Sequence, residues 1–180
     1  IRKCGFVTYR SWVIVNFLLS TGIRQNSLIN IKIKDLDFDN DMVYINTTKN
    51  RKSLIIPLNE DIVKILHEYL KYRGGGSDDW LFCSIYGEKM TKGANYTALW
   101  DYSHSRGLDK TGVHRYRHTF AKKWVTMGGS IVMLQKILGH SSLAITEGYL
   151  NMLTTDLKKD MNEINIIRSL KQERMQIVRH

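Results

Sequence analysis

Six polar side chains that lie far apart in the sequence are of the types that transfer of a phosphodiester without a metal ion requires. A phosphodiester under attack accumulates negative charge on its non-bridging oxygens, and guanidinium and imidazole groups can meet that charge. The nucleophile must be a hydroxyl that can hold the phosphate as an ester, and the departing oxygen needs a proton donor. Two arginines and two histidines can meet the charge, a tyrosine can attack and a lysine can supply the proton: Arg24, Arg117, His114, His140, Tyr149 and Lys49.

Tyr149 is the member of this set that depends most on its neighbours. A free phenol has a pKa near about 10, so it is a poor nucleophile at pH 7. Nearby cations and a base are therefore needed to activate it. The hypothesis demands that all six side chains converge on one spot of the size of a phosphate group.

The first part of the chain predicts a buried helix and a small sheet. Apolar residues recur at helical spacing over 12–19 and stop at a turn, so that Arg24 follows the end of a helix. Three short runs of strand-forming residues come next, and they predict an antiparallel sheet. Lys49 lies in the basic turn 48–52 between the second and third of these runs, which are 36–39, 42–47 and 53–56.

Four further helices are expected. Asn59 opens one whose apolar residues Ile62, Ile65, Leu66, Tyr69 and Leu70 form a single stripe, and the glycine run at 74–76 ends it. A polar helix is predicted over 93–105. Two more are expected over 113–124 and over 131–138, the second capped by Ser130 and ended by Gly139, directly before His140.

His114 and Arg117 share one side of the predicted helix 113–124. Tyr116, Phe120 and Trp124 are apolar and are placed on its opposite side, so we expect His114 and Arg117 to point outward toward a groove. An ordinary surface pair is the alternative.

Composition favours a nucleic-acid partner. The chain has 180 residues, with 27 Lys and Arg against 17 Asp and Glu and a formal net charge of +10. This charge attracts polyanions, although a basic surface that only aids solubility is the alternative. No apolar run approaches the roughly 20 residues that a membrane span needs. Cys4 and Cys83 lack neighbouring histidines at metal-ligand spacing, so a cytoplasmic protein without disulfides or a zinc site is expected.

Five segments in fixed order resemble the boxes of the tyrosine recombinases, the phage-type integrases. Residues 21–24, Thr-Gly-Ile-Arg, resemble the first arginine box, and 49–58 resemble the lysine turn that precedes a Val-Pro-Leu strand. Residues 114–121, His-Arg-Tyr-Arg-His-Thr-Phe-Ala, resemble the His-x-x-Arg box. Residues 138–142 resemble the Leu-Gly-His-Ser segment, and 146–149 place a tyrosine nine residues after its histidine. Each box alone is weak, but the ordered set is specific.

The resemblance implies a fold, an activity and a role for each residue. The fold is α+β and mainly α-helical, with a helical core and a three-stranded antiparallel sheet at one edge. Arg24 and Arg117 would clamp the scissile phosphate, with His114 and His140 bonded to its oxygens. Tyr149 would attack to give a 3′-phosphotyrosyl enzyme, and Lys49 would protonate the leaving 5′ oxygen. Neither a metal ion, another cofactor nor ATP is implied.

One departure from the family pattern concerns the first arginine. Family members often carry an acidic residue three positions after it, and here that residue is Ser27. What supports Arg24 is therefore left open.

Double-stranded DNA is the expected substrate. Contacts to its phosphates would orient it without reading its sequence. The side chains expected to make them are Arg51, Lys52, Lys92, Lys110, Arg115, Lys122 and Lys123.

The resemblance also implies an organisation beyond this chain. Residues 1–152 are expected to be the catalytic domain, and a helical DNA-binding domain is expected to precede it in a longer protein. Apolar residues at helical spacing over 153–167 predict a tail helix within 153–180, which either packs on its own domain or is exchanged between protomers. A tetramer on DNA and a monomeric isolated domain are expected.

Other interpretations remain open for single residues and for the whole chain. Arg24 and His140 could cap helix ends, Lys49 could be a solvated turn residue with Lys52 in its role, and Tyr149 could be a buried aromatic residue. His118 is interpreted as structural. For the whole chain, the main hypothesis is a recombinase that integrates or excises a mobile element. The rivals are a type IB topoisomerase, which relaxes one duplex, and a DNA-binding accessory protein that does not cut.

Overall fold

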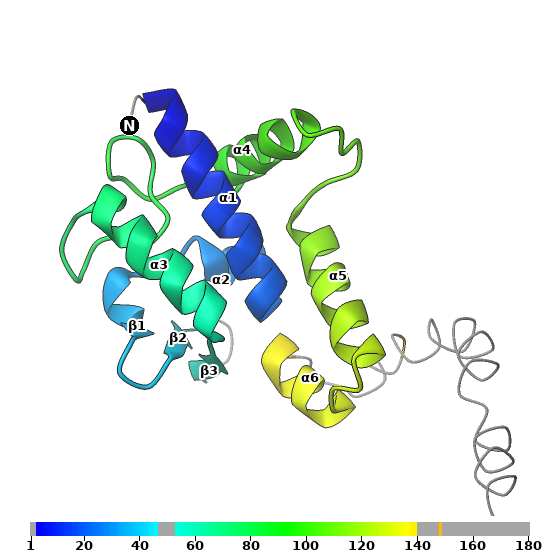
Figure 1. Cartoon of the computed structure of the whole chain (residues 1–180). Coiled ribbons are helices and arrows are strands. Elements are labelled where there is room, and N and C mark those ends of the chain that lie inside the picture. The colour runs from blue at the N-terminus through cyan, green and yellow to red at the C-terminus, as the bar shows by residue number, and fades with distance from the viewer. Residues whose placement is uncertain (1–2, 47–52, 140–147, 149–180) are drawn as a thin grey trace, which may run out of the picture.

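The computed structural model describes residues 3–46, 53–139 and 148. Helices dominate this part of the chain, and its named strands form one antiparallel sheet of three strands at one edge (Figure 1). The predicted fold class is therefore confirmed. In chain order the elements are α1 (Lys3–Thr21), α2 (Gln25–Leu28), η1 (Ile33–Asp35), β1 (Leu36–Asp37), β2 (Met42–Asn46), β3 (Ser53–Pro57), α3 (Glu60–Arg73), α4 (Lys92–His104), α5 (Val113–Thr126) and α6 (Ile131–Leu138).

The sheet has the strand order β1-β2-β3, and its register places alternate side chains in the core. Val43 and Ile45 of β2 are buried, whereas Met42 and Tyr44 are half-buried. Val43 pairs with Ile56 of β3, which is also buried. Because successive side chains of a strand point to opposite faces, a slip of one residue would turn Val43 and Ile45 toward solvent.

α1 is the central helix of the larger core, and it begins nine residues earlier than the sequence predicted. Phe6 and Tyr9 are half-buried against this core, so they extend the stripe that Val13 and Phe17 form at full burial. α3, α4 and α5 all pack against α1. None of the helices that the structure describes, α1 included, is long and apolar enough to cross a membrane.

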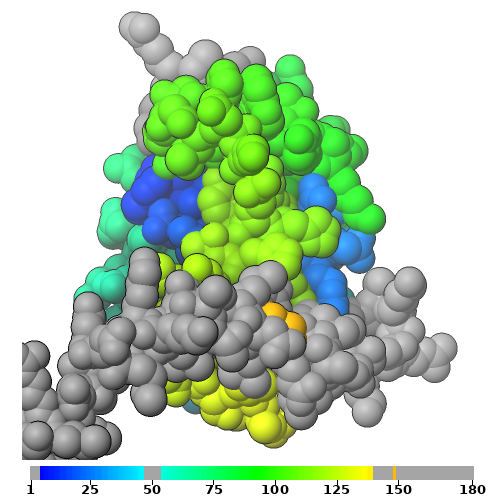
Figure 2. Space-filling view, turned by 90° about the vertical axis from the view of Figure 1, so that its right-hand side faces the viewer, coloured from blue at the N-terminus to red at the C-terminus, as the bar shows by residue number. Residues whose placement is uncertain are grey.

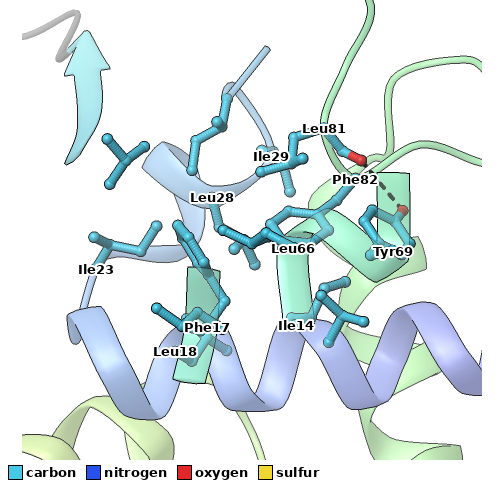
Figure 3. Close-up of a cluster of buried hydrophobic side chains, with 14 of the residues drawn as sticks. Ile14, Phe17, Leu18, Ile23, Leu28, Ile29, Leu66, Tyr69, Leu81 and Phe82 are labelled. Atoms are coloured by element: carbon cyan, nitrogen blue, oxygen red, sulfur yellow. Dashed lines mark hydrogen bonds between the residues drawn. The ribbon is translucent and has the colours of Figure 1, made fainter. Parts of the chain in front are cut away.

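Aromatic rings fill the space between α1, α3 and the segment that follows α3 (Figure 3). Phe17 of α1 meets Phe82 edge to face, with ring centroids 5.6 Å apart. Tyr69 of α3 is fully buried, and its hydroxyl donates to the carbonyl of Leu81 at 3.2 Å. Each buried side chain of this size stabilises the fold by roughly 1.5–3 kcal/mol. This core is the rigid frame of the molecule.

Several helix ends follow the capping pattern of the sequence. The side chain of Asn59 accepts from the backbone N–H of Ile62 at 3.0 Å and begins α3. Ser130 does the same for Met133 at 3.4 Å and begins α6. Gly139 ends α6 in the left-handed conformation, with φ of 59° and ψ of 42°, which glycine adopts without steric cost. These predicted boundaries are confirmed.

α5 and α6 share a second, smaller hydrophobic cluster. The indole of Trp124 in α5 donates to the carbonyl of Ser130 at 3.0 Å and closes the turn between the two helices. Figure 1 shows α5 on the side away from β1 and α6 below it, beside β3, which α6 contacts. The buried members of the cluster are Phe120, Ala121, Val125, Leu134 and Leu138.

Candidate functional site

Arg24 follows a turn at which only glycine fits. Gly22 has a φ of +59°, and a Cβ added to it would lie 2.8 Å from Cε1 of Phe120 in α5. After this turn Arg24 has extended backbone and immediately precedes α2. Its side chain is exposed, and Nη2 donates to the carbonyl of Gly139 at 2.9 Å. Arg24 of the first arginine box is thereby joined to Gly139, which lies 115 positions later.

Arg117 lies on α5 and is buried, with 7% of its surface exposed. Its Nη1 donates to the carbonyl of Gly22 at 2.6 Å, and its Nη2 donates to the carbonyl of Leu138 at 2.8 Å. A buried charge is costly unless it is hydrogen-bonded, and these two carbonyls offset that cost. Arg117 therefore connects the end of α1, α5 and the end of α6.

The prediction that Arg117 points away from the apolar side of α5 is wrong. Val113, Phe120 and Ala121 are buried with it. Residues three and four positions apart lie on the same side of a helix, so Arg117 belongs to the stripe that starts at Val113. His114 is exposed, as predicted.

The two guanidinium groups meet at the C-terminal end of α6. They bind the carbonyls of successive residues, Leu138 for Arg117 and Gly139 for Arg24. The last carbonyls of a helix have no partner within the helix and carry partial negative charge, which favours cations. Arg24 does cap a helix C-terminus, as its alternative interpretation held, but the helix is α6 and not α1. The sequence does not predict these carbonyl partners, because every residue has a backbone carbonyl and residue types do not indicate which of them accepts a hydrogen bond.

Position 27 is a serine, and a backbone carbonyl holds Arg24 where many family members have an acidic residue. Among the described residues Arg24 makes no ion pair, and the Gly139 carbonyl is what holds its guanidinium. The neighbouring Gln25 donates from Nε2 to the carbonyl of Lys92 at 2.8 Å, which ties α2 to the start of α4. Backbone carbonyls thus support this corner of the site.

His114 occupies the first turn of α5, one helical turn before Arg117. Its imidazole makes no hydrogen bond to any of the residues that the structure describes. Within the described part of the chain, the backbone of α5 is therefore what positions it. The structure brings Arg24, Arg117 and this turn of α5 into one region.

Three of the six candidate catalytic residues, Lys49, His140 and Tyr149, lie outside the described residues. The same holds for Arg51 and Lys52 of the expected DNA contacts and for the tail 153–180. Their roles stay predictions. His140 is the residue after Gly139 in the chain, and Gly139 carries the carbonyl that Arg24 binds.

The other expected DNA contacts are exposed and lie in a basic part of the chain. Residues 92–139 hold eight Lys and Arg against two Asp and Glu, and α5 contains no acidic residue. Figure 2 shows a face on which α4 and its following loop, α5 and part of α6 are visible. The expected DNA contacts with exposed side chains are Lys92, Lys110, Arg115, Lys122 and Lys123.

A tyrosine, two histidines and a cysteine without a proposed role are buried or stacked on aromatic rings. Burial raises the pKa of the Tyr69 phenol well above its usual value. The ring of His67 stacks on Phe38 with centroids 4.1 Å apart, and that of His104 stacks on Trp100 at 4.6 Å. The thiol of Cys83 is buried and free.

Comparison with known proteins places this geometry among DNA recombinases. A sequence profile described as the Phage integrase family matches residues 5–156. The tyrosine recombinase XerA of Saccharolobus solfataricus is 31% identical over 148 residues, which are 82% of this chain and 48% of that protein. Among solved structures, the XerA recombinase has a TM-score of 0.77 at 28% identity and covers 91% of this chain and 61% of its own.

A second solved structure contains DNA. The XerH site-specific recombinase, bound to a palindromic difH substrate in a post-cleavage complex, has a TM-score of 0.71 at 26% identity. The match covers 89% of this chain and 46% of that one. The chain spans about half the length of the curated relatives it matches.

Proposed function

Since the chain belongs to the phage integrase family, the tyrosine recombinases, we propose that it is the catalytic domain of an enzyme that cuts and rejoins double-stranded DNA at specific sites. The proposed intermediate is a 3′-phosphotyrosyl ester on Tyr149. The proposed reaction needs no ATP, because the energy of the broken bond is kept in the ester, and no metal ion, because guanidinium and imidazole groups meet the charge on the phosphate.

The observation that carries this proposal is the meeting of Arg24 and Arg117 at the end of α6. Guanidinium groups bind phosphate oxygens through paired N–H donors, and two of them can neutralise the charge that develops in the transition state. The carbonyls of Gly22, Leu138 and Gly139 hold these groups before any substrate is present. A site that is organised in advance loses little free energy to reorganisation during the reaction.

Each candidate then takes one role. The phenol oxygen of Tyr149 attacks phosphorus and passes its proton to His114, and the bond from phosphorus to the 5′ oxygen breaks. Lys49 donates a proton to that leaving oxygen. His140 donates a hydrogen bond to a phosphate oxygen beside the two arginines. In the return step a 5′ hydroxyl attacks the phosphotyrosyl ester and releases Tyr149.

The biological reaction that we propose is integration or excision of a mobile element in the cytoplasm. The description of the matching family supports this choice. Joining two DNA partners requires several active sites, so we propose a homotetramer on DNA whose subunits exchange the tail 153–180. A helical domain that precedes this one would close around the duplex, and the basic residues of α4 and α5 would contact its phosphates.

Covalent capture tests the proposal. The full-length protein that contains this chain is mixed with a pool of nicked duplexes of randomised sequence, so that the cut strand diffuses away and the ester accumulates. We expect a protein–DNA adduct on a denaturing gel, and sequencing of the captured DNA will identify the target site. Tyr149→Phe should abolish the adduct, whereas Tyr86→Phe, which changes an exposed tyrosine elsewhere, should not.

Three outcomes would contradict the proposal. An adduct that persists in Tyr149→Phe would exclude Tyr149 as nucleophile, and the absence of any adduct from the unmodified protein would favour a DNA-binding protein that does not cut. Relaxation of a supercoiled plasmid without exchange between two duplexes would favour the topoisomerase reaction.

A further inference from the structure

Three hydroxyl groups form a closed network beside the first turn of α5. The hydroxyls of Ser103 and Tyr116 lie 2.7 Å apart, and Thr111 donates to Ser103 at 2.8 Å. The hydroxyls of Thr111 and Tyr116 lie 3.1 Å apart. Ser103 is near the end of α4, Thr111 ends the connecting loop, and Tyr116 is in α5. We call these three residues the hydroxyl cluster.

The start of α5 has no side-chain cap of its own. The N-cap residue is Gly112, with a φ of 138°, and it provides no side-chain hydrogen bond to the helix. The backbone N–H groups of Arg115 and Tyr116 both donate to the Gly112 carbonyl, at 2.9 and 3.2 Å. Uncapped first turns open readily, because several of their N–H groups have no partner in the helix.

Ser103 gives the hydroxyl cluster a rigid base. It is fully buried, and its carbonyl accepts from the backbone N–H groups of Arg106 at 3.0 Å and Leu108 at 3.1 Å. One residue therefore holds the loop through its backbone and α5 through its side chain. Tyr116 packs its ring on the larger core as well.

His114 lies in the turn that this network holds. Because its imidazole has no hydrogen-bond partner among the described residues, nothing in that part of the chain except the α5 backbone can set its direction. Arg117, in the next turn of α5, is held separately by the carbonyls of Gly22 and Leu138. The first and second turns of α5 thus have different supports.

We propose that Ser103, Thr111 and Tyr116 are positioning residues that hold His114 in place for proton transfer. The proposal rests on the proposed function for the reaction itself, but not for the effect on α5. Proton transfer requires donor and acceptor within hydrogen-bond reach, and displacement of a catalytic group by about 1 Å can cost up to 100-fold in rate. Removal of the Tyr116 hydroxyl leaves its ring in the core and loosens only the first turn.

The decisive experiment is a double-mutant cycle between Tyr116→Phe and His114→Ala in the full-length protein. The single-turnover rate of adduct formation is measured at saturating nicked DNA, with long time courses for the slow variants. Tyr116→Phe should lower the rate by about tenfold, and it should have no further effect once His114 is alanine. A defect in folding alone would lower the rate in both backgrounds.

A matched control variant and a second cluster variant accompany the double-mutant cycle. Tyr102 lies one position before Ser103, and its hydroxyl has no hydrogen-bond partner among the described residues, while Arg106 covers its ring at 3.7 Å. Tyr102→Phe should leave the rate unchanged. Ser103→Ala should reproduce the effect of Tyr116→Phe, and the two together should be no slower than either alone.

Hydrogen exchange tests the hydroxyl cluster independently of cleavage. The amides of Arg115 and Tyr116 should exchange faster in Tyr116→Phe than in the unmodified protein, with α1 unchanged. A wild-type rate in Tyr116→Phe, or an equal loss in both backgrounds of the cycle, would overturn the proposal. If the unmodified protein forms no adduct, the proposed function fails, and unchanged exchange at these amides would then overturn the positioning role separately.

Discussion

The larger core and the α5–α6 cluster differ in size and in the charge around them. The larger core has 22 buried residues, of which all but Ala98, Leu99 and Val113 lie within residues 3–91, whereas the smaller has five. Ten of the Asp and Glu residues fall within 3–91, against two within 92–139. The larger region is the scaffold of the described part of the chain, and the smaller is a basic unit that packs on it.

Arg117 lies where the two regions join. Val113, one turn before it, belongs to the larger core, and Phe120, one turn after it, belongs to the smaller cluster. Its guanidinium binds Gly22 on the scaffold and Leu138 on α6. The candidate site is therefore built at the boundary of the two regions, where the larger core contributes Gly22 and the smaller unit contributes the end of α6.

Arg117→Lys should produce the largest effect, because it breaks this junction. An ammonium group cannot bind two carbonyls and a phosphate with the geometry of a guanidinium. We expect adduct formation at saturating DNA to fall by roughly 100-fold to 1,000-fold, with some loss of thermal stability.

Arg10→Lys is the matched control for that experiment. Arg10 is also buried, but it lies in the larger core, where it donates to the carbonyl of Cys83 and covers the ring of Phe6 at 5.7 Å. The Arg10→Lys variant should be less stable than the unmodified protein, but it should cleave DNA at the same rate. Equal losses of cleavage in the two variants would show that Arg117 acts only through folding.

Leucine-to-alanine substitutions compare the two cores directly. Leu66 and Leu134 are both fully buried, in α3 and α6, and such substitutions cost about 2–5 kcal/mol. Leu66→Ala should lower the global free energy of unfolding. Leu134→Ala should mainly open α6, because few other contacts hold it. Hydrogen exchange separates the cases: in Leu134→Ala the amides of α6 should exchange faster and those of α1 should not. A parallel increase in both helices would show that the two cores unfold as one.

The smallest expected effect concerns the charge difference. Lys122→Gln with Lys123→Gln removes two exposed cations from α5. If this surface contacts DNA, the slope of log K against log salt should become shallower by about 1 for each lost phosphate contact. The control is Lys64→Gln with Lys71→Gln on α3, where each lysine is paired with a glutamate. An unchanged slope in the α5 variant, or an equal change in the control, would remove α5 from the DNA interface.

Much of the fold was predictable from local patterns. The stripe of α3 with its Asn59 cap, the three strands and the helix between Ser130 and Gly139 all depend on neighbours within a few residues. The start of α1 was not predictable, because Phe6 and Tyr9 become helical core residues only through contact with α3. The hydroxyl cluster was not predictable either, because the residue types and spacing of a serine, a threonine and a tyrosine do not indicate that their hydroxyls hydrogen-bond to one another.

The amino-acid sequence specifies which chemical groups are available, their order along the chain and the turns that precede them. The burial of Arg117 and its meeting with Arg24 at the end of α6 become visible in the folded chain alone. This is because their partners are backbone carbonyls, which every residue possesses. Which of these carbonyls is free to accept depends on where a helix ends and on what packs against that end.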